Sequence, residues 1–188
     1  MSWVPRRAAP AMAAVLVLIS VCTLTAQPVQ RSEYEIKAAY LFTFAKFVEW
    51  QTRTGRDDST FTICIVGPDP FGAVLDTTLN GVNIRGRKIG ARRLTPDDPA
   101  AGCHIVFVGA SEERSVGAIV PPLTQAGVLT VSDMPRFAER GGMIQFTTSA
   151  NRVRFEINLT AAREAGLMMS SELLRVASSV RMGANVVQ

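Results

Sequence analysis

Cys103 and His104 are the residues best suited to catalysis, because a cysteine can act as a nucleophile and a histidine as a general base. They are adjacent, and His104 opens an apolar run, residues 104–108, that is typical of a buried strand. Neighbouring side chains on a strand point to opposite faces, so the two cannot form a nucleophile–base dyad. His104 is the only histidine in the chain, and we interpret it as a polar residue at a strand end.

Other motifs that could carry chemistry are weaker. Residues 67–72, Gly-Pro-Asp-Pro-Phe-Gly, lie between an apolar run and a helical pattern, where a phosphate-binding loop would be expected. This segment lacks the Walker lysine and the dinucleotide glycine spacing, and its prolines remove backbone donors. The acidic pairs at 57–58 and 97–98 are typical of solvated loops. The sequence therefore predicts no catalytic residues and no cofactor.

The cysteines bear on the metal and disulfide chemistry. Cys64 and Cys103 remain after the N-terminal segment, and in an exported domain such a pair favours a disulfide. Closing a loop of roughly 40 residues would stabilise the fold by about 4 kcal/mol. Two buried, reduced thiols are the alternative. A zinc site would lack a ligand, because His104 brings the set only to three, so no metal is predicted.

The first 26 residues have the pattern of an export signal. Arg6 and Arg7 are their only charges, and an uncharged stretch with an apolar centre at 13–19 follows. We predict a signal peptide over 1–26, cleaved after Ala26, and a protein that works in an oxidising compartment outside the cytoplasmic membrane, with no membrane insertion afterwards. The apolar stretch falls short of the roughly 20 residues of a membrane span. A retained anchor and lipidation at Cys22 are the alternatives.

The charge balance does not indicate nucleic-acid binding. The formal charge of +4 falls to +2 without the two signal arginines, with 18 basic against 16 acidic residues. One local basic run, from Arg85 to Arg93, contains a glycine-broken strand pattern. We interpret it as a solvent-facing strand edge, with contact to acidic lipid or a partner as the alternative.

The pattern after the signal predicts a single α/β domain over 33–182, between a flexible leader at 27–32 and a loose tail at 183–188. Short apolar runs at 61–66, 104–108 and 128–131 alternate with helical patterns at 71–79 and after Ser111. This alternation is typical of a parallel sheet buried on both faces. We predict a three-layer, Rossmann-like domain with a mostly parallel sheet and a C-terminal hairpin and helices.

A helix is predicted over residues 33–51. Ser32 and Glu35 have the spacing of a capping box, and apolar residues recur at intervals of three and four. Leu41, Phe42 and Trp50 widen the apolar stripe. The helix is therefore either deeply buried or carries a second apolar face, and these three residues are the candidate dimer surface.

The C-terminal part predicts a hairpin of residues 143–147 and 152–157, followed by helices over 158–165 and 170–180. In its second strand Arg152, Arg154 and Glu156 share one face, and apolar residues occupy the other. We interpret the charged face as part of a contact with a partner protein. An ordinary solvated sheet face is the alternative.

Three segments resemble the YfiR/HmsC-like family of exported bacterial proteins. They are residues 35–50, residues 61–67 with the later Cys103, and residues 141–144 with 151–159. The resemblance implies a non-catalytic periplasmic regulator with an α/β fold and a homodimeric state. Its partner would be the periplasmic sensor domain of a membrane diguanylate cyclase, whose repression controls cyclic di-GMP, biofilm and exopolysaccharide output. It also matches Cys64 and Cys103 to a family disulfide, whereas a second family cysteine pair near the hairpin is absent.

Two other functions compete with this regulator. A small-ligand module would use the carboxyl ends of the strands, where the segments 67–69 and 109–111 would line a crevice. An exported enzyme would need converging titratable groups, which the sequence does not indicate.

Overall fold

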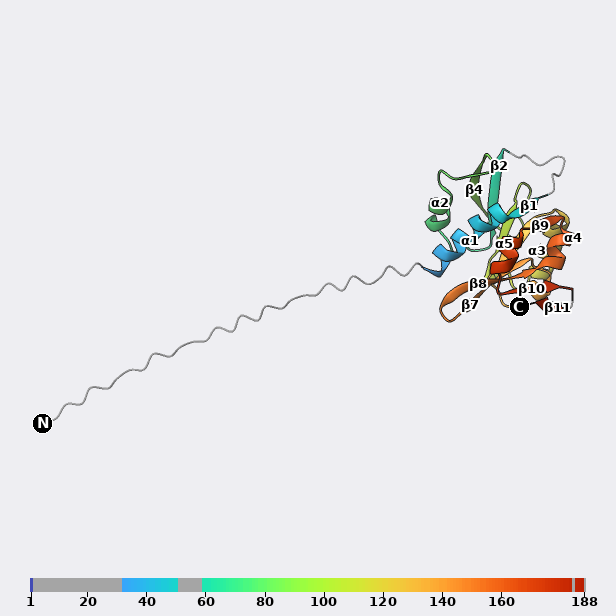
Figure 1. Cartoon of the computed structure of the whole chain (residues 1–188). Helices are drawn as coiled ribbons and strands as arrows, with labels where there is room; N and C mark the ends of the chain where they lie inside the picture. Colours follow the sequence, from blue (N-terminus) through green and yellow to red (C-terminus); the bar gives the residue numbers. More distant parts are fainter. Residues whose placement is uncertain (2–31, 51–58, 184, 188) are drawn as a thin grey trace. The chain divides into compact units, whose positions relative to one another are not determined.

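The computed structural model describes Met1 and residues 32–50, 59–183 and 185–187, with side chains only as far as Gly183 (Figure 1). The predicted signal peptide apart from Met1, the leader at 27–32 apart from Ser32, and the acidic pair at 57–58 lie outside the described residues.

The core element is a nine-stranded sheet with the order β11-β10-β8-β7-β6-β5-β2-β4-β3 (Figure 1). Its strands are β2 (Thr60–Val66), β3 (Asn83–Ile84), β4 (Arg87–Leu94), β5 (Ile105–Val108), β6 (Leu129–Ser132), β7 (Ile144–Ser149), β8 (Arg152–Asn158), β10 (Ser179–Met182) and β11 (Asn185–Val187). A second sheet pairs β1 (Val48–Trp50) with β9 (Leu167–Met169). The helices are α1 (Glu33–Phe47), α2 (Ala73–Leu79), α3 (Val116–Gln125), α4 (Leu159–Glu164) and α5 (Ser171–Val176), with 3-10 turns η1 (Ala110–Glu112) and η2 (Ala138–Arg140).

Most neighbouring strands in the large sheet are parallel. The ladder from β4 through β2, β5 and β6 to β7 is parallel throughout, and β10 is parallel to β8. The pairs β3–β4, β7–β8 and β10–β11 are antiparallel. This confirms the predicted α/β class, the mostly parallel sheet and the C-terminal hairpin. The narrower Rossmann-like description stays a prediction.

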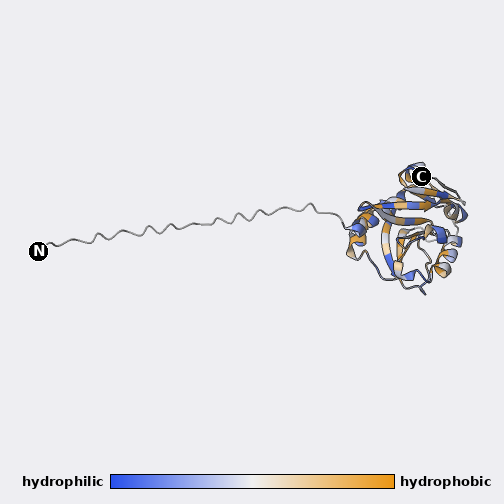
Figure 2. Ribbon diagram, turned by 90° about the horizontal axis from the view of Figure 1, so that it is seen from below, coloured by the Kyte–Doolittle hydropathy of each residue, from blue (hydrophilic) through white to orange (hydrophobic). Residues whose placement is uncertain are grey.

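The sheet has apolar side chains on both faces because its central strands are buried. In β5, Ile105 and Phe107 belong to one hydrophobic cluster with α1, α2, α4 and α5. Val106 and Val108 belong to a second cluster with α3. The outer strands carry apolar and polar residues in turn, as the orange and blue positions along the ribbon in Figure 2 show.

The first helix begins as predicted and ends earlier. The Ser32 amide donates to Glu35 Oε2 (2.9 Å) and the Glu35 amide donates to Ser32 Oγ (3.2 Å), which completes the capping box. The predicted helix to residue 51 is wrong, because α1 ends at Phe47 and the next three residues form β1. Antiparallel pairing of Val48 with Met169 provides these residues with ladder hydrogen bonds in place of a last helical turn.

Two other predicted helices also differ from the structure. Ser111 caps no α-helix: its hydroxyl donates to Glu112 Oε1 inside a 3-10 turn, and α3 starts only at Val116. The predicted helix over 170–180 ends at Val176, and β10 then pairs with β8. In the segment 183–188, where we expected a loose tail, residues 185–187 form β11 and pair with β10. These pairings cover strand edges that would otherwise lie open.

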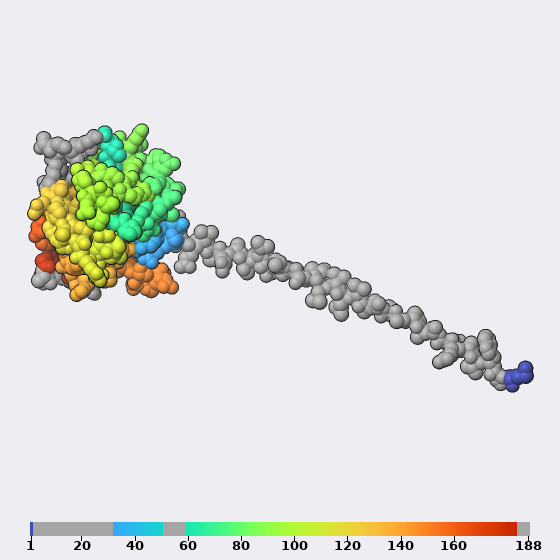
Figure 3. All heavy atoms as spheres, turned by 180° about the vertical axis from the view of Figure 1, so that it is seen from behind, coloured from blue at the N-terminus to red at the C-terminus, as the bar shows by residue number. Residues whose placement is uncertain are grey.

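Cys64 and Cys103 form the predicted disulfide, with an S–S distance of 1.97 Å and a Cα–Cα distance of 5.9 Å. Both residues are fully buried in the cluster on the α3 face. The Arg92 guanidinium donates to Cys103 Sγ (3.4 Å) and to the carbonyls of Pro99 (3.1 Å) and Ala101 (2.9 Å). The bond and this arginine together attach the loop before β5 to the sheet. Figure 3 shows this face, with that loop in yellow-green.

Candidate functional site

The hairpin of β7 and β8 presents a polar face, as predicted. Arg152 and Arg154 are exposed and Glu156 is half-buried, whereas Val153, Phe155 and Ile157 between them are buried. The partner residues on β7 continue the polar face, because Ser149, Thr147 and Gln145 lie opposite the three charged residues in turn.

The opposite face of the hairpin is held by aromatic packing. Phe155 lies edge-on to Phe44 and Tyr40 of α1, with ring centroids 5.1 and 5.2 Å apart, and Phe146 lies 5.8 Å from Phe44. The turn at Ala150 and Asn151 has positive φ at both residues, as a two-residue hairpin turn requires. The charged face is therefore carried by a ladder whose far side is part of the core.

The charges of this face are not used within the domain. In the part of the chain that the structure describes, Arg152, Arg154 and Glu156 form no ion pair. Arg181, by contrast, pairs with Glu139 (2.9 Å). The hairpin charges remain available to a partner molecule.

A cavity of about 440 Å³ opens beside the hairpin. It lies where β6 ends at Ser132 while β7 continues to Ser149, so it occupies the carboxyl end of the parallel strands. Gln145 and Thr147 line it and also belong to the polar face of the hairpin. The full lining is Glu33, Tyr34, Lys37, Ala110, Asp133, Pro135, Gln145, Phe146, Thr147 and Thr148.

A buried lysine is the main polar group of this cavity. The Lys37 side chain is only 3% exposed, and its Nζ lies 2.6 Å from both Glu33 Oε1 and Asp133 Oδ2. The Tyr34 hydroxyl donates to the same Asp133 oxygen (3.1 Å), and Nζ lies 4.4 Å from the centroid of the Tyr34 ring. The cluster links the first turns of α1 to the end of β6.

The electrostatics of the cluster keep Lys37 protonated. Burial acts to lower the pKa of Lys37, but the hydrogen bonds from Nζ to Asp133 and Glu33 outweigh it and raise the pKa above its ordinary value. Burial and the negative charge of Asp133 raise the pKa of Tyr34. A lysine that stays charged is no nucleophile at neutral pH, so the cluster suits binding and positioning rather than covalent chemistry.

The ligand crevice expected between segments 67–69 and 109–111 is closed at the point where they meet. The Gly109 amide donates to Val66 O (2.9 Å). A Cβ on Gly67 would lie 2.8 Å from Glu112 Oε1 and 2.9 Å from Ser111 Oγ. The cavity around Lys37 reaches this sheet edge at Ala110.

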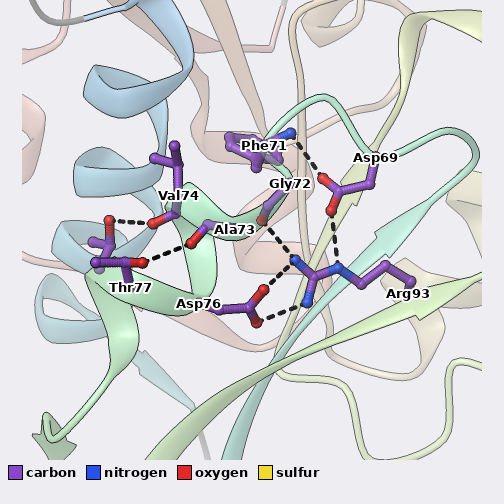
Figure 4. A network of polar contacts seen from close by, with 9 residues as sticks. Asp69, Phe71, Gly72, Ala73, Val74, Asp76, Thr77 and Arg93 are labelled. Carbon is purple, nitrogen blue, oxygen red and sulfur yellow. Dashed lines mark hydrogen bonds and ion pairs between the residues drawn. The ribbon is translucent and has the colours of Figure 1, made fainter.

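Asp69, in the first of these segments, has a structural partner (Figure 4). Arg93 donates from Nε to Asp69 Oδ2 (2.9 Å), from Nη1 and Nη2 to the two Asp76 oxygens (2.8 and 2.7 Å), and from Nη2 to Gly72 O (2.9 Å). These hydrogen bonds lower the pKa of Asp76. The arginine thereby fixes the loop after β2 and the start of α2 against β4.

The remaining residues of interest lie in the core or at its margin. His104 directly precedes β5 and is 1% exposed, and its ring stacks on Phe61 at 4.4 Å. His104 Nδ1 accepts the Thr62 amide (3.2 Å), and Trp50 Nε1 donates to the His104 carbonyl (3.2 Å). In the described ranges, with their gap at 51–58, three or more His, Cys, Asp or Glu residues nowhere gather as a metal site would require.

The candidate dimer surface does not form one helix face. Leu41 is 0% exposed and belongs to the core, so its assignment to an outer surface is wrong. Phe42 is half-buried on α1 and Trp50 lies on β1. The homodimer itself stays a prediction.

The Lys37–Asp133 pair was not predicted from the sequence. Lysines on an amphipathic helix ordinarily face water. The sequence pattern therefore does not distinguish a buried lysine from an exposed one. Two signals were present: Glu33 and Lys37 have the i,i+4 spacing of an ion pair, and Asp133 directly follows an apolar strand at its carboxyl end.

These observations define an α/β domain with an internal disulfide and a charged hairpin face. The sequence profile described as YfiR/HmsC-like matches residues 34–178. The chain belongs to this family, a family of non-catalytic regulators. Among solved structures, a conserved domain protein from Vibrio cholerae O1 biovar El Tor is similar, at 15% identity and a TM-score of 0.49. That match covers 64% of this chain and 54% of the Vibrio chain.

The helices of the described residues are all too short or too polar to cross a bilayer.

Proposed function

We propose that the protein is a periplasmic regulator that binds the periplasmic sensor domain of an inner-membrane diguanylate cyclase and represses cyclic di-GMP formation. Membership of the YfiR/HmsC-like family carries this proposal. The buried disulfide is consistent with an oxidising compartment.

The contact surface that we assign to the cyclase is the charged face of the hairpin, Arg152, Arg154 and Glu156. Its charges are unpaired within the described domain, and its backbone is rigidly laddered, so binding would order little else. Charged groups at the exposed rim of an interface increase the rate of association and select the partner more than they add affinity.

Repression requires a difference in affinity between two states of the partner. A regulator shifts a receptor toward its silent state only by binding that state more tightly. Moving the equilibrium from 1:99 to 99:1 takes about a 10⁴-fold preference. A rigid hairpin suits this task because it presents one fixed charge pattern, which a changed partner conformation would no longer match.

Binding to the purified sensor domain tests the proposal. The double variant R152E/R154E should weaken binding at least tenfold by calorimetry, and E156K should weaken it less. Arg163→Glu is the matched control, because Arg163 is an exposed arginine on α4, away from the hairpin. Equal affinity of the wild type and the double variant would remove the hairpin from the contact.

The cavity around Lys37 favours a second candidate function, a small-ligand module. It has a buried ammonium, two carboxylates and an aromatic ring at the carboxyl end of the strands. A specific periplasmic metabolite should raise the melting temperature of the wild type, and this shift should be lost in Asp133→Ala. A shift that persists in the variant would place the ligand elsewhere.

A further inference from the structure

One long edge of the large sheet lacks a neighbouring strand. On its inner side β4 pairs with β2 over seven positions, from Lys88 to Leu94. On its outer side β4 pairs with β3 only at Arg87 and Lys88. Before β3 the Val82 amide turns away and donates to Leu79 O, so the chain leaves this edge toward α2. The outer edge of residues 89–94 is therefore open.

The turn geometry identifies the backbone groups that face outward. Arg85 and Gly86 form the two-residue turn with positive φ, which makes Ile84 and Arg87 a hydrogen-bonded pair. By alternation, the N–H and C=O groups of Ile89, Ala91 and Arg93 also point outward. Among the described residues, none of these groups has a hydrogen-bond partner on that side.

The open edge borders a groove large enough for a strand. A cavity of about 720 Å³ lies between the end of α2, the loop after it and the first half of β4. In Figure 3 this part of the chain is coloured green, at the upper right of the domain. The lining residues are Asp76, Thr77, Leu79, Asn80, Gly81, Val82, Asn83, Lys88, Ile89, Gly90 and Ala91.

The edge is strongly basic. No acidic residue occurs between Asp76 and Asp97, whereas this stretch contains five basic residues. Arg93 is neutralised by its two aspartates. Arg92 donates to carbonyls and a sulfur, and Lys88 is exposed with no ion pair in the described part of the chain. Lys88 and Arg92 share one face of the strand, because they are four residues apart.

We propose that the outer edge of β4 accepts an extended acidic segment of a partner protein as an additional strand. Main-chain hydrogen bonds to Ile89, Ala91 and Arg93 would provide affinity, and an acidic side chain opposite Gly90 would lie diagonal to Lys88 and set the register. This site is separate from the hairpin face and does not depend on the proposed repression.

A second copy of this chain fits the edge poorly. Antiparallel self-pairing centred on Arg92 would place that residue opposite itself, and pairing centred on Ala91 would place the Arg92 side chains of the two copies diagonal to each other. Like charges directly opposite each other destabilise a sheet, and basic residues are a common protection of exposed edges against self-association.

The test uses the oxidised domain and a capped eight-residue peptide of alternating glutamate and valine. Binding should be seen by calorimetry, and amide exchange should slow at Ile89, Ala91 and Arg93. Two further peptides are N-methylated either on every glutamate or on every valine. Since Lys88 fixes the face of the glutamates, one methylated peptide should lose binding more than tenfold and the other should keep it.

Lys88→Glu should weaken peptide binding at least fivefold, and Arg163→Glu should leave it unchanged. Equal behaviour of the two methylated peptides, protection at the hairpin, or no binding would overturn the proposal. So would binding of phosphatidylglycerol vesicles with no effect of the peptide, because the basic edge would then serve a lipid surface. Each of these outcomes leaves the binding of the cyclase sensor domain to be judged by the hairpin variants alone.

Discussion

Strands β4 and β8 of the large sheet use their arginines in opposite ways. At β4 the arginine side chains are bound inward: Arg92 holds the loop before β5 and Arg93 holds Asp69 and Asp76. At β8 the backbone is paired with β7 from Arg152 onward and with β10 only from Glu156 to Asn158, while Arg152 and Arg154 extend into solvent. The arginine side chains of one region are therefore engaged within the domain, and those of the other region are not.

The arginines of the two strands therefore have different roles, one set in stability and the other in recognition. A guanidinium that donates to several acceptors inside the domain stabilises the fold and has few N–H groups left to donate to a partner. An unpaired exposed guanidinium contributes little to stability and is free to bind. We therefore expect substitutions at the β4 end to lower the free energy of unfolding, and substitutions on the hairpin face to change binding alone.

Removing the disulfide should have the largest effect on stability. Replacing Cys64 and Cys103 by alanine frees a loop with a sequence separation of 39 residues, and the unfolding free energy should fall by about 4 kcal/mol in urea titrations. Addition of a reductant to the wild type should give a similar loss. A loss below about 1 kcal/mol would mean that Arg92 and the surrounding core hold the loop without the bond.

Asp133→Ala should have the second largest effect, because among the described residues it leaves the buried Lys37 ammonium with Glu33 as its only carboxylate. Loss of one partner of a buried pair predicts a decrease of about 3 kcal/mol. Adding Lys37→Met to Asp133→Ala should restore part of that loss, since the uncompensated charge disappears. An unchanged unfolding free energy in Asp133→Ala would show that water already solvates Lys37.

The same cluster predicts a loss of stability at alkaline pH. The pKa values of Lys37 and Tyr34 are both raised in the folded state, so the folded protein binds these protons more tightly than the unfolded chain. Their contribution is complete below a pH of about 10 and is lost as the pH rises through the folded-state values. Unfolding measured between pH 8 and 11.5 should show the decline, and Asp133→Ala should flatten it.

Arg93→Gln should have a smaller effect, because the guanidinium is partly exposed and solvent screens its ion pairs. We expect a decrease of about 1 kcal/mol in the free energy of unfolding. The dependence of the unfolding free energy on pH in the acidic range should change as well. The pKa of Asp76 is lowered in the folded state, so its contribution is lost as the pH falls below about 4, and Arg93→Gln should remove that dependence.

The hairpin substitutions should change stability least. In R152E/R154E the unfolding free energy should stay within about 0.5 kcal/mol of the wild type, as is usual for exposed positions without partners. Binding to the sensor domain should nevertheless be lost. A large drop in stability would mean that these arginines have a structural role like that of Arg93.

The sequence predicted most of the elements whose patterns are local. The capping box at Ser32, the apolar parallel strands and the alternation in the hairpin are all readable from neighbouring residues. The disulfide was favoured by cysteine content and matched to the family by resemblance. The errors arose where long-range pairing determined the structure: residues 48–50 pair with β9, and residues 179–182 pair with β8.

In the candidate site, too, local patterns were predicted from the sequence and long-range contacts were not. Alternation placed Arg152, Arg154 and Glu156 on one face, but no local signal placed Lys37 against Asp133, 96 residues away. Likewise, the basic run after residue 84 does not reveal which of its arginines are paired. Gly142 is a further case: a Cβ there would lie 2.2 Å from the Phe137 ring, a contact that only the tertiary structure defines.

Cellular cyclic di-GMP tests the central proposal most directly. Deletion of the gene should raise the cyclic di-GMP level, and expression of the wild type or of Arg163→Glu should restore it. Expression of R152E/R154E, present in the periplasm at the wild-type level, should not restore it. A cyclic di-GMP level that is unchanged by the deletion would contradict the account.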